Sequence, residues 1–206
     1  MFLKLVALLI YQRLCFSSIN NRANQMQTPS SARLFVGFSL DKPQIDKILH
    51  LQQTLITKIN TNSVATLAHN LHITLGFFGQ IDPTTCSKIH EAINQMPKTT
   101  FSQVIDTFAW WQTAQLICLK GQASTSLNTM ANDINNIAKT HHLAISQYDY
   151  VPHISLFRGV TTASLPTVVK DTQLIIAPSH LHLYQSTGRH NNVNYTILES
   201  WPLLQK

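Results

Sequence analysis

The chain has 206 residues, of which 44% are hydrophobic and 12% are charged, and it carries a formal net charge of +6 at pH 7. This length can bury a complete core, and the composition favours a folded, soluble protein over a disordered one. The positive charge predicts an anionic partner. Because lysine and arginine form no run, we expect recognition of a phosphate at one site and not a broad nucleic-acid-binding surface.

The cysteines bear on the compartment of the protein. Three occur, at Cys15, Cys86 and Cys118, and they are far apart in the sequence. None is spaced like the paired cysteines of zinc or redox sites. A reduced, cytoplasmic location is the simplest interpretation.

The first 31 residues pose a separate question. Residues 1–11 combine a lysine with an apolar run, as in a short signal peptide, but polar residues interrupt the run and no clear cleavage site follows. The run is too short to span a bilayer, so we expect no stable membrane association. We interpret residues 1–31 as a disordered tail or a weak signal-like segment, with Met26 as an alternative start.

The first half of the folded chain alternates strand and helix signals. Asp41 is a predicted helix cap with Pro43 in the first turn, and Asp82 and Pro97 mark the start and the stop of a second helix. In chain order the pattern predicts a strand, a helix, a turn, a strand and a helix, over residues 33–40, 41–59, 60–63, 71–79 and 82–97.

The second half continues in a similar way. Its predicted elements are a β-like stretch, a helix, a strand, a short helix and three closing strands, over residues 101–119, 124–138, 148–158, 165–170, 174–177, 180–185 and 193–198. The order of strand, helix, strand and helix is loosely repeated between the halves. This repetition predicts two similar lobes that face each other across a cleft.

Two short stretches share one pattern of histidine, apolar residue, hydroxyl residue and leucine. They are Leu-His-Ile-Thr-Leu over residues 71–75 and Pro-His-Ile-Ser-Leu over residues 152–156. In a strand, successive side chains point to opposite faces, so His72 and Thr74 share a face, and so do His153 and Ser155. We therefore expect two histidines to converge on one small anionic group.

With these motifs the chain resembles the 2H phosphoesterases, and within them the RNA 2′,3′-cyclic phosphodiesterases once called 2′-5′ RNA ligases. The resemblance covers about residues 32–203. It rests on Arg-Leu-Phe-Val from residue 33, on both histidine motifs, on His-Leu-Tyr-Gln-Ser from residue 182, on Tyr195 and on Trp-Pro-Leu from residue 201. It implies one α+β domain over residues 32–206, with a bilobal 2H phosphoesterase fold of two related antiparallel-sheet lobes with outer helices around a central cleft. It also implies a monomer without cofactor or metal that acts on RNA or a nucleotide with a 2′,3′-cyclic phosphate end.

The resemblance implies roles for the two histidines. His72 would be the proton donor to the leaving 3′ oxygen and His153 the proton acceptor that activates water, which yields a 2′-phosphate; local sequence does not distinguish acid from base. Histidine suits both roles because its ordinary pKa lies near 6.5. Thr74 and Ser155 would donate hydrogen bonds to the non-bridging phosphate oxygens.

Further contacts to the substrate are expected around these four residues. Arg158 is a candidate for a charge-assisted contact to the phosphate, or alternatively for an ion pair at the rim of the cleft. Phe78 and Tyr150 are candidates to stack on the base. Many relatives carry lysine or arginine where this chain has Gly76, so a phosphate contact from that position is missing.

Other interpretations of the histidines and of the fold stay open at this point. Pairs at His69-x-x-His72, His141-His142 and His180-x-His182 could hold a metal, but no acidic or cysteine ligand accompanies them at metal-site spacing. The same fold could instead form or cleave 2′-5′ linkages, as a 2′-5′ RNA ligase or a 2′-5′ oligonucleotide phosphodiesterase. A non-catalytic nucleotide- or RNA-binding module is the alternative from another class.

Overall fold

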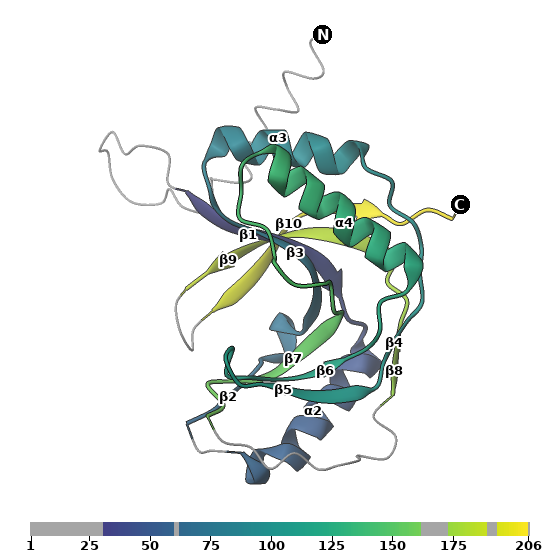
Figure 1. Cartoon of the computed structure of the whole chain (residues 1–206). Helices are drawn as coiled ribbons and strands as arrows, with labels where there is room; N and C mark the ends of the chain where they lie inside the picture. Colours follow the sequence, from purple (N-terminus) through teal and green to yellow (C-terminus); the bar gives the residue numbers. More distant parts are fainter. Residues whose placement is uncertain (1–30, 60–61, 162–172, 189–192, 206) are drawn as a thin grey trace.

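The computed structural model describes residues 31–59, 62–161, 173–188 and 193–205 (Figure 1). The expected tail or signal-like segment with Met26 lies outside these residues, and so does the predicted helix over 165–170. Within the described ranges, no helix combines the length and the apolar character needed to cross a membrane.

An antiparallel sheet of eight strands dominates the fold, in the order β10-β9-β1-β3-β7-β6-β5 with β2 beside β7. Its strands are β1 (Ala32–Ser39), β2 (Val64–Ala65), β3 (His72–Ile81), β5 (Thr107–Trp111), β6 (Leu116–Lys120), β7 (His153–Arg158), β9 (His180–Thr187) and β10 (Asn194–Pro202). A separate antiparallel pair is formed by β4 (Gln103–Ile105) and β8 (Leu174–Ile176).

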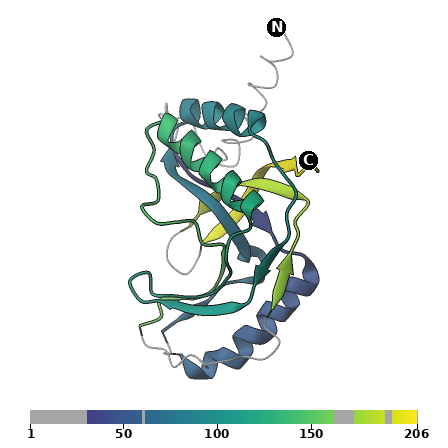
Figure 2. The same ribbon diagram turned by 45° about the vertical axis from the view of Figure 1, so that its right-hand side comes forward.

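The large sheet consists of two lobes that meet at one residue pair. Neighbouring strands within each lobe are paired over most of their length, but β3 and β7 pair only at Ile73 and Ile154. Strands β10, β9, β1 and β3 therefore form one lobe, and β7, β6, β5 and β2 form the other (Figures 1 and 2). The predicted α+β fold with two antiparallel-sheet lobes is confirmed.

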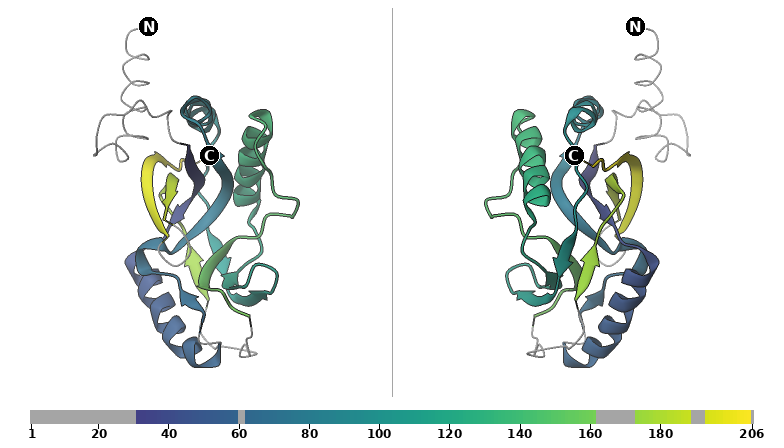
Figure 3. Two further views of the ribbon diagram at one scale, coloured as in Figure 1. Left: turned by 90° about the vertical axis from the view of Figure 1, so that its left-hand side faces the viewer. Right: turned by 90° about the vertical axis from the view of Figure 1, so that its right-hand side faces the viewer.

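Three helices cover the outer surfaces of these lobes: α2 (Lys42–Leu55), α3 (Pro83–Gln95) and α4 (Thr125–Thr140). The side views show α3 and α4 next to each other on the first lobe and α2 along the opposite end of the molecule (Figure 3). The buried side chain of Gln52 ties α2 to the second lobe, because its Nε2 donates to the carbonyl oxygens of Thr66 and Leu156. Each lobe thus has a helical outer layer.

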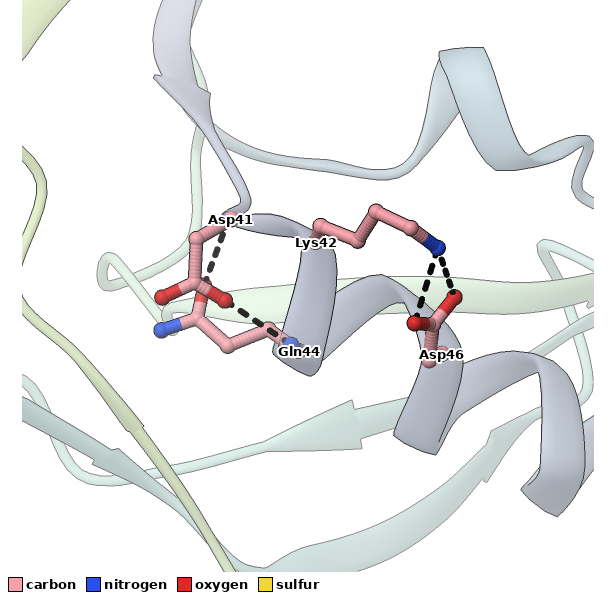
Figure 4. Close-up of polar contacts among 4 residues, drawn as sticks. All are labelled: Asp41, Lys42, Gln44 and Asp46. Carbon is pink, nitrogen blue, oxygen red and sulfur yellow. Dashed lines mark hydrogen bonds and ion pairs between the residues drawn. The ribbon is translucent and has the colours of Figure 1, made fainter.

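Local sequence explains where the helices begin. Asp41 and Gln44 form a capping box, in which Gln44 N donates to Asp41 Oδ1 at 2.8 Å and Asp41 N donates to Gln44 Oε1 at 3.0 Å (Figure 4). Lys42, the first residue of the helix, forms an ion pair with Asp46 one turn later, with 2.9 Å between Nζ and Oδ2. The predicted end of this helix at residue 59 is wrong, because its last turn tightens into a 3₁₀ turn, η1 (Ile56–Lys58).

Two predicted strands also differ from the observed ones. The β-like stretch over 101–119 divides into β4, β5 and β6, because β4 pairs with β8, while a turn after Trp111 brings β6 back alongside β5. The second histidine strand begins at His153 and not at residue 148. Pro152 immediately precedes it and has no N–H group to donate to a neighbouring strand.

Candidate active site

The pairing between the lobes brings the two histidine motifs together. An antiparallel pair has a local two-fold axis between its partners, so the Ile73–Ile154 pair relates His72 to His153 and Thr74 to Ser155. Both isoleucines are completely buried. The flanking histidines and hydroxyls therefore project from the opposite face, as the alternation in the sequence predicts.

The ring of His72 is held in one orientation by two hydrogen bonds. Nδ1 lies 2.6 Å from the carbonyl oxygen of Asn70, and Nε2 lies 2.9 Å from Thr74 Oγ1. A carbonyl can only accept, so Nδ1 carries the proton and the Thr74 hydroxyl donates to Nε2 of the neutral ring. His72 is 8% exposed, so few other partners can reach it.

His153 is held in the same way from the other motif. Its Nδ1 donates to the carbonyl oxygen of Val151 at 2.8 Å, again two residues earlier in the chain. In the part of the chain that the structure describes, Nε2 has no hydrogen-bond partner. The indole of Trp111 packs against the imidazole edge to face, with ring centroids 4.6 Å apart. His153 thus offers one free ring nitrogen in a fixed direction.

The environment lowers the pKa of both histidines. Burial is the largest cause for His72 and brings its pKa from 6.5 to about 4; the bond to Asn70 opposes this shift, while the charges of Arg158 and His153 add to it. Burial also lowers the pKa of His153, and the charge of Arg158 acts in the same direction. The charges act on the rings because the Ile73–Ile154 pair brings the two motifs together and Arg158 lies beside Ser155 of the second motif.

Arg158 lies at the far end of β7 from His153. Its Nη2 is 3.4 Å from Ser155 Oγ, and its side chain is exposed to solvent. An exposed guanidinium beside a hydroxyl can turn toward an anion that contacts both groups. No carboxylate pairs with Arg158 among the described residues, so the alternative of an ion pair at the rim finds no support in this part of the chain.

The prediction that Phe78 stacks on a base is wrong. Phe78 is 2% exposed and belongs to the hydrophobic core. The pairing of β3 with β1 skips Leu75, because Gly37 pairs with Thr74 while the preceding residue, Val36, pairs with Gly76. This β-bulge reverses the alternation of side chains directly after the motif, so Phe77 is the exposed aromatic residue, with 62% of its surface accessible.

Tyr150 connects the two motifs. Its hydroxyl donates to the carbonyl oxygen of Thr74 at 3.0 Å, and burial raises its pKa, which keeps the donor proton in place. The phenol therefore holds the segment before β7 against β3. Its stacking on a base stays a prediction.

A group of aromatic residues behind His72 was not identified from the sequence. Phe35 stacks on Tyr184 with centroids 4.8 Å apart, and Tyr195 meets both Phe35 and His72 edge to face at 4.9 and 5.0 Å. The residues come from β1, β9 and β10, which meet only in the folded sheet. The alternation of side chains along each strand could have shown which face each aromatic residue occupies. It could not show that these three strands are neighbours in the sheet.

Gly76 faces helix α4 and not the site. A Cβ atom there would lie 2.5 Å from Cγ2 of Ile134, a buried residue of α4. The space that a longer side chain needs is therefore filled by the core.

We expect Gly76→Ala to lower the free energy of unfolding by about 1–3 kcal/mol, because the added methyl group overlaps Ile134. Ile134→Ala removes the overlapping atom, so the loss in the double variant should be smaller than the sum of the two single losses. Urea unfolding of the four proteins measures this. Additive losses of unfolding free energy would show that contact with Ile134 is not the reason why alanine at position 76 destabilises the protein.

The remaining histidine pairs differ in their surroundings. His182 is engaged at both ring nitrogens, by Ser200 Oγ at 2.8 Å and by Ser39 Oγ at 3.1 Å, and its ring stacks on His180 at 6.1 Å. Among the residues that the structure describes, no three or more histidine, cysteine or acidic side chains are grouped as metal ligands would be.

Comparison with known proteins agrees with this architecture. A crystal structure of a phosphoesterase is 24% identical and superposes with a TM-score of 0.75 over 85% of this chain and 99% of the other. E. coli LigT complexed with NADP+ is 23% identical, with a TM-score of 0.74 over the same shares. The resemblance to the 2H phosphoesterases is confirmed, and the chain has the fold of that class.

Within that class a particular curated relative can be named. The RNA 2′,3′-cyclic phosphodiesterase of Escherichia coli (strain K12) is 25% identical over 175 residues, which cover 84% of this chain and 97% of the relative. No protein-family model matches the chain.

Proposed function

We propose that the protein is a metal-independent phosphodiesterase that hydrolyses the 2′,3′-cyclic phosphate end of RNA to a 2′-phosphate. One observation carries the proposal: His72 and His153 are related by a local two-fold axis, and each holds its Nδ1 proton on a backbone carbonyl. Each ring therefore keeps Nε2 as its acid or base atom. A site that only bound a nucleotide would not need two such groups.

In the proposed reaction, His153 Nε2 removes a proton from water as the water oxygen attacks phosphorus. The bond between phosphorus and the 3′ oxygen breaks, and His72 Nε2 gives its proton to that oxygen. The free Nε2 of His153 supports its role as the base. The assignment of His72 as the acid rests on the resemblance to the family.

The low pKa of His72 sets a condition for this mechanism. Before substrate binds, His72 is neutral at pH 7, since its pKa is about 4. A bound phosphate places a negative charge beside the ring and raises the pKa of His72. Nε2 of His72 then takes up the proton that it later gives to the leaving 3′ oxygen. Protonated Nε2 no longer accepts from Thr74, so the hydroxyl becomes free to donate to the phosphate.

The other polar groups of the site suit the transition state. Thr74 and Ser155 are hydroxyl donors at equivalent positions of the two motifs, and Arg158 lies beside Ser155. As charge gathers on the non-bridging oxygens, these three groups would stabilise it from both strands. The aromatic side chain of Phe77, exposed at the same face, is a better candidate than Phe78 for stacking on a base.

The relatives support the same substrate class. The curated relative is named for RNA 2′,3′-cyclic phosphodiesterase activity, and E. coli LigT has been crystallised with 3′-AMP and with phosphate. We extend this to a single domain over residues 32–206 that acts as a cytoplasmic monomer. Size-exclusion chromatography with light scattering tests the monomer.

The reaction is tested by incubating the purified protein with a 2′,3′-cyclic nucleotide and with a short RNA carrying that end, with and without excess chelator. We expect release of a 2′-phosphate at the same rate in both conditions. Activity that a chelator abolishes and zinc restores would contradict the proposal. Turnover restricted to 2′-5′ linkages would assign the protein to the alternative reaction.

We expect kcat/KM to be bell-shaped in pH, with its maximum on the acid side of pH 6.5. The reaction needs one protonated and one neutral histidine, and in the free protein the pKa of His72 is about 4 while that of His153 is also lowered. The kcat maximum should lie at higher pH, because bound phosphate raises the pKa of His72. A value of kcat/KM that rises steadily into the alkaline range would contradict catalysis by one protonated and one neutral histidine.

A further inference from the structure

A polar cavity of about 640 Å³ opens beside the second histidine motif. It lies where β4 and the start of β5 approach the end of β6 and the turn into α4. The lining residues that matter here are Ser102, Gln103, Asp106, Thr107, Lys120 and Gln122. No step of the proposed reaction uses any of them.

One row of paired residues runs from the cavity to His153. Thr107 pairs with Lys120 across β5 and β6, and Lys120 pairs with His153 across β6 and β7. Directly paired residues of antiparallel strands project from the same face. The next row, with Leu119 and Ile154, is completely buried on the other face. Lys120 and Thr107 therefore extend the face that carries His153.

The backbone that orients the catalytic ring also forms part of the wall. Val151, whose carbonyl accepts from His153 Nδ1, lines the cavity. A further anchor is the buried side chain of Gln103, whose Nε2 donates to the carbonyl of Gln122 at 2.8 Å and whose Oε1 accepts from Ser124 N at 2.9 Å. These bonds hold β4 against the segment between β6 and α4, which forms the rest of the wall.

Charge is unevenly distributed within the cavity. Lys120 is nearest to the histidine motif, and its charge lowers the pKa of the Cys118 thiol on the same face, partly offsetting burial. Asp106 is exposed and accepts from Thr107 Oγ1 at 2.8 Å. An anion would be attracted to Lys120 and repelled by Asp106. The region around Asp106 suits hydroxyl and amino donors instead.

We propose that this cavity binds the nucleotide that precedes the cyclic-phosphate end of an RNA strand, with Lys120 contacting the phosphate that links the two nucleotides. The inference rests on the proposed function and narrows it to oligonucleotides. The phosphate that links the two nucleotides is an anion next to the end bound at His153. Lys120 lies on the neighbouring strand, β6, directly paired with His153, and can contact that anion. The ribose hydroxyls and base edges beyond it meet Asp106, Ser102 and Gln122.

The first test compares kcat/KM for a 2′,3′-cyclic mononucleotide and for a trinucleotide with the same end. We expect the wild type to prefer the trinucleotide, and Lys120→Met to lower that preference about tenfold, the loss typical of one charge-assisted contact. Lys88→Met removes an equal charge from an exposed position of α3 and should leave the preference unchanged. Equal use of both substrates by the wild type would overturn the inference.

The second test measures binding and does not depend on turnover. The probes are a fluorescent trinucleotide ending in a 2′-phosphate and the matching nucleoside 2′-phosphate. Lys120→Met should weaken binding of the trinucleotide alone and reduce the slope of its log affinity against log salt by about 0.7. Ser102→Trp, which fills the cavity from an exposed position, should also weaken it selectively.

The two proposals fail in different ways. Absence of turnover on both the mononucleotide and the trinucleotide would overturn the proposed function. The ratio of the affinities for the two probes, trinucleotide over nucleoside 2′-phosphate, would still decide the role of the cavity. If Lys120→Met weakened binding of both probes equally, with a thermal unfolding midpoint like that of the wild type, the cavity proposal would be overturned. The proposed hydrolysis would not be affected by that result.

Discussion

Replacing His72 or His153 by alanine is expected to lower kcat on a 2′,3′-cyclic phosphate end by about 10²–10⁴-fold for each residue. Each substitution removes an Nε2 atom that the proposed mechanism uses for proton transfer. His153→Ala should leave the affinity for a nucleoside 2′-phosphate within a few-fold, because Ser155 and Arg158 remain in place. Rapid-quench kinetics and equilibrium titration of the two variants measure both quantities.

The pair is also expected to act as a unit. A variant lacking both histidines should lose little more activity than either single variant, since one proton transfer without the other gives little acceleration. His50→Ala removes an exposed histidine of α2 and serves as the matched control. Activity retained in either single variant, with the native fold shown by circular dichroism, would contradict the assignment.

Thr74→Val and Ser155→Ala are expected to lower kcat by about 10²–10³-fold each, because each removes a preorganised donor to the charge that develops on the phosphate oxygens. Valine keeps the shape of threonine, so packing of the buried Thr74 is disturbed little. Steady-state kinetics on the cyclic nucleotide measures both losses.

Conservative variants separate the role of the hydroxyl from that of packing. Thr74→Ser and Ser155→Thr keep a donor and should retain most of the activity. Thr74→Val has a second signature: it removes the hydroxyl that donates to His72 Nε2, so the pKa of His72 should rise, as NMR titration of the imidazole would show. A pKa unchanged in Thr74→Val would mean that this hydrogen bond does not stabilise neutral His72.

Several features followed from local sequence because local interactions govern them. Asp41 and Asp82 cap helices with their own following residues, so both helix starts were predictable. The strict alternation around His72 and His153 predicted which side chains share a face, and burial of Ile73 and Ile154 agrees. The histidine pair could be chosen from ten histidines because only these two are followed by an apolar residue, a hydroxyl residue and leucine.

Other features depend on which strands become neighbours. Phe78 was assigned to the site and Phe77 was not, because the bulge that exchanges their faces arises from the pairing of β3 with β1. Trp111 contacts His153, and Lys120 is paired with it, only because β5 and β6 add to β7. The packing of Ile134 against Gly76 likewise requires α4 to lie on β3.

By itself, the sequence determined the two histidine motifs, the faces of their strands and the starts of the helices, since alternation and capping act over a few residues. The class of fold followed from the resemblance that these motifs carry. The tertiary structure alone decided the two-fold relation of the motifs, the lowered pKa values of the histidines and the cavity at Lys120. These depend on pairing and burial between segments far apart in the chain. Such pairing is selected by the whole core, and no local pattern encodes it.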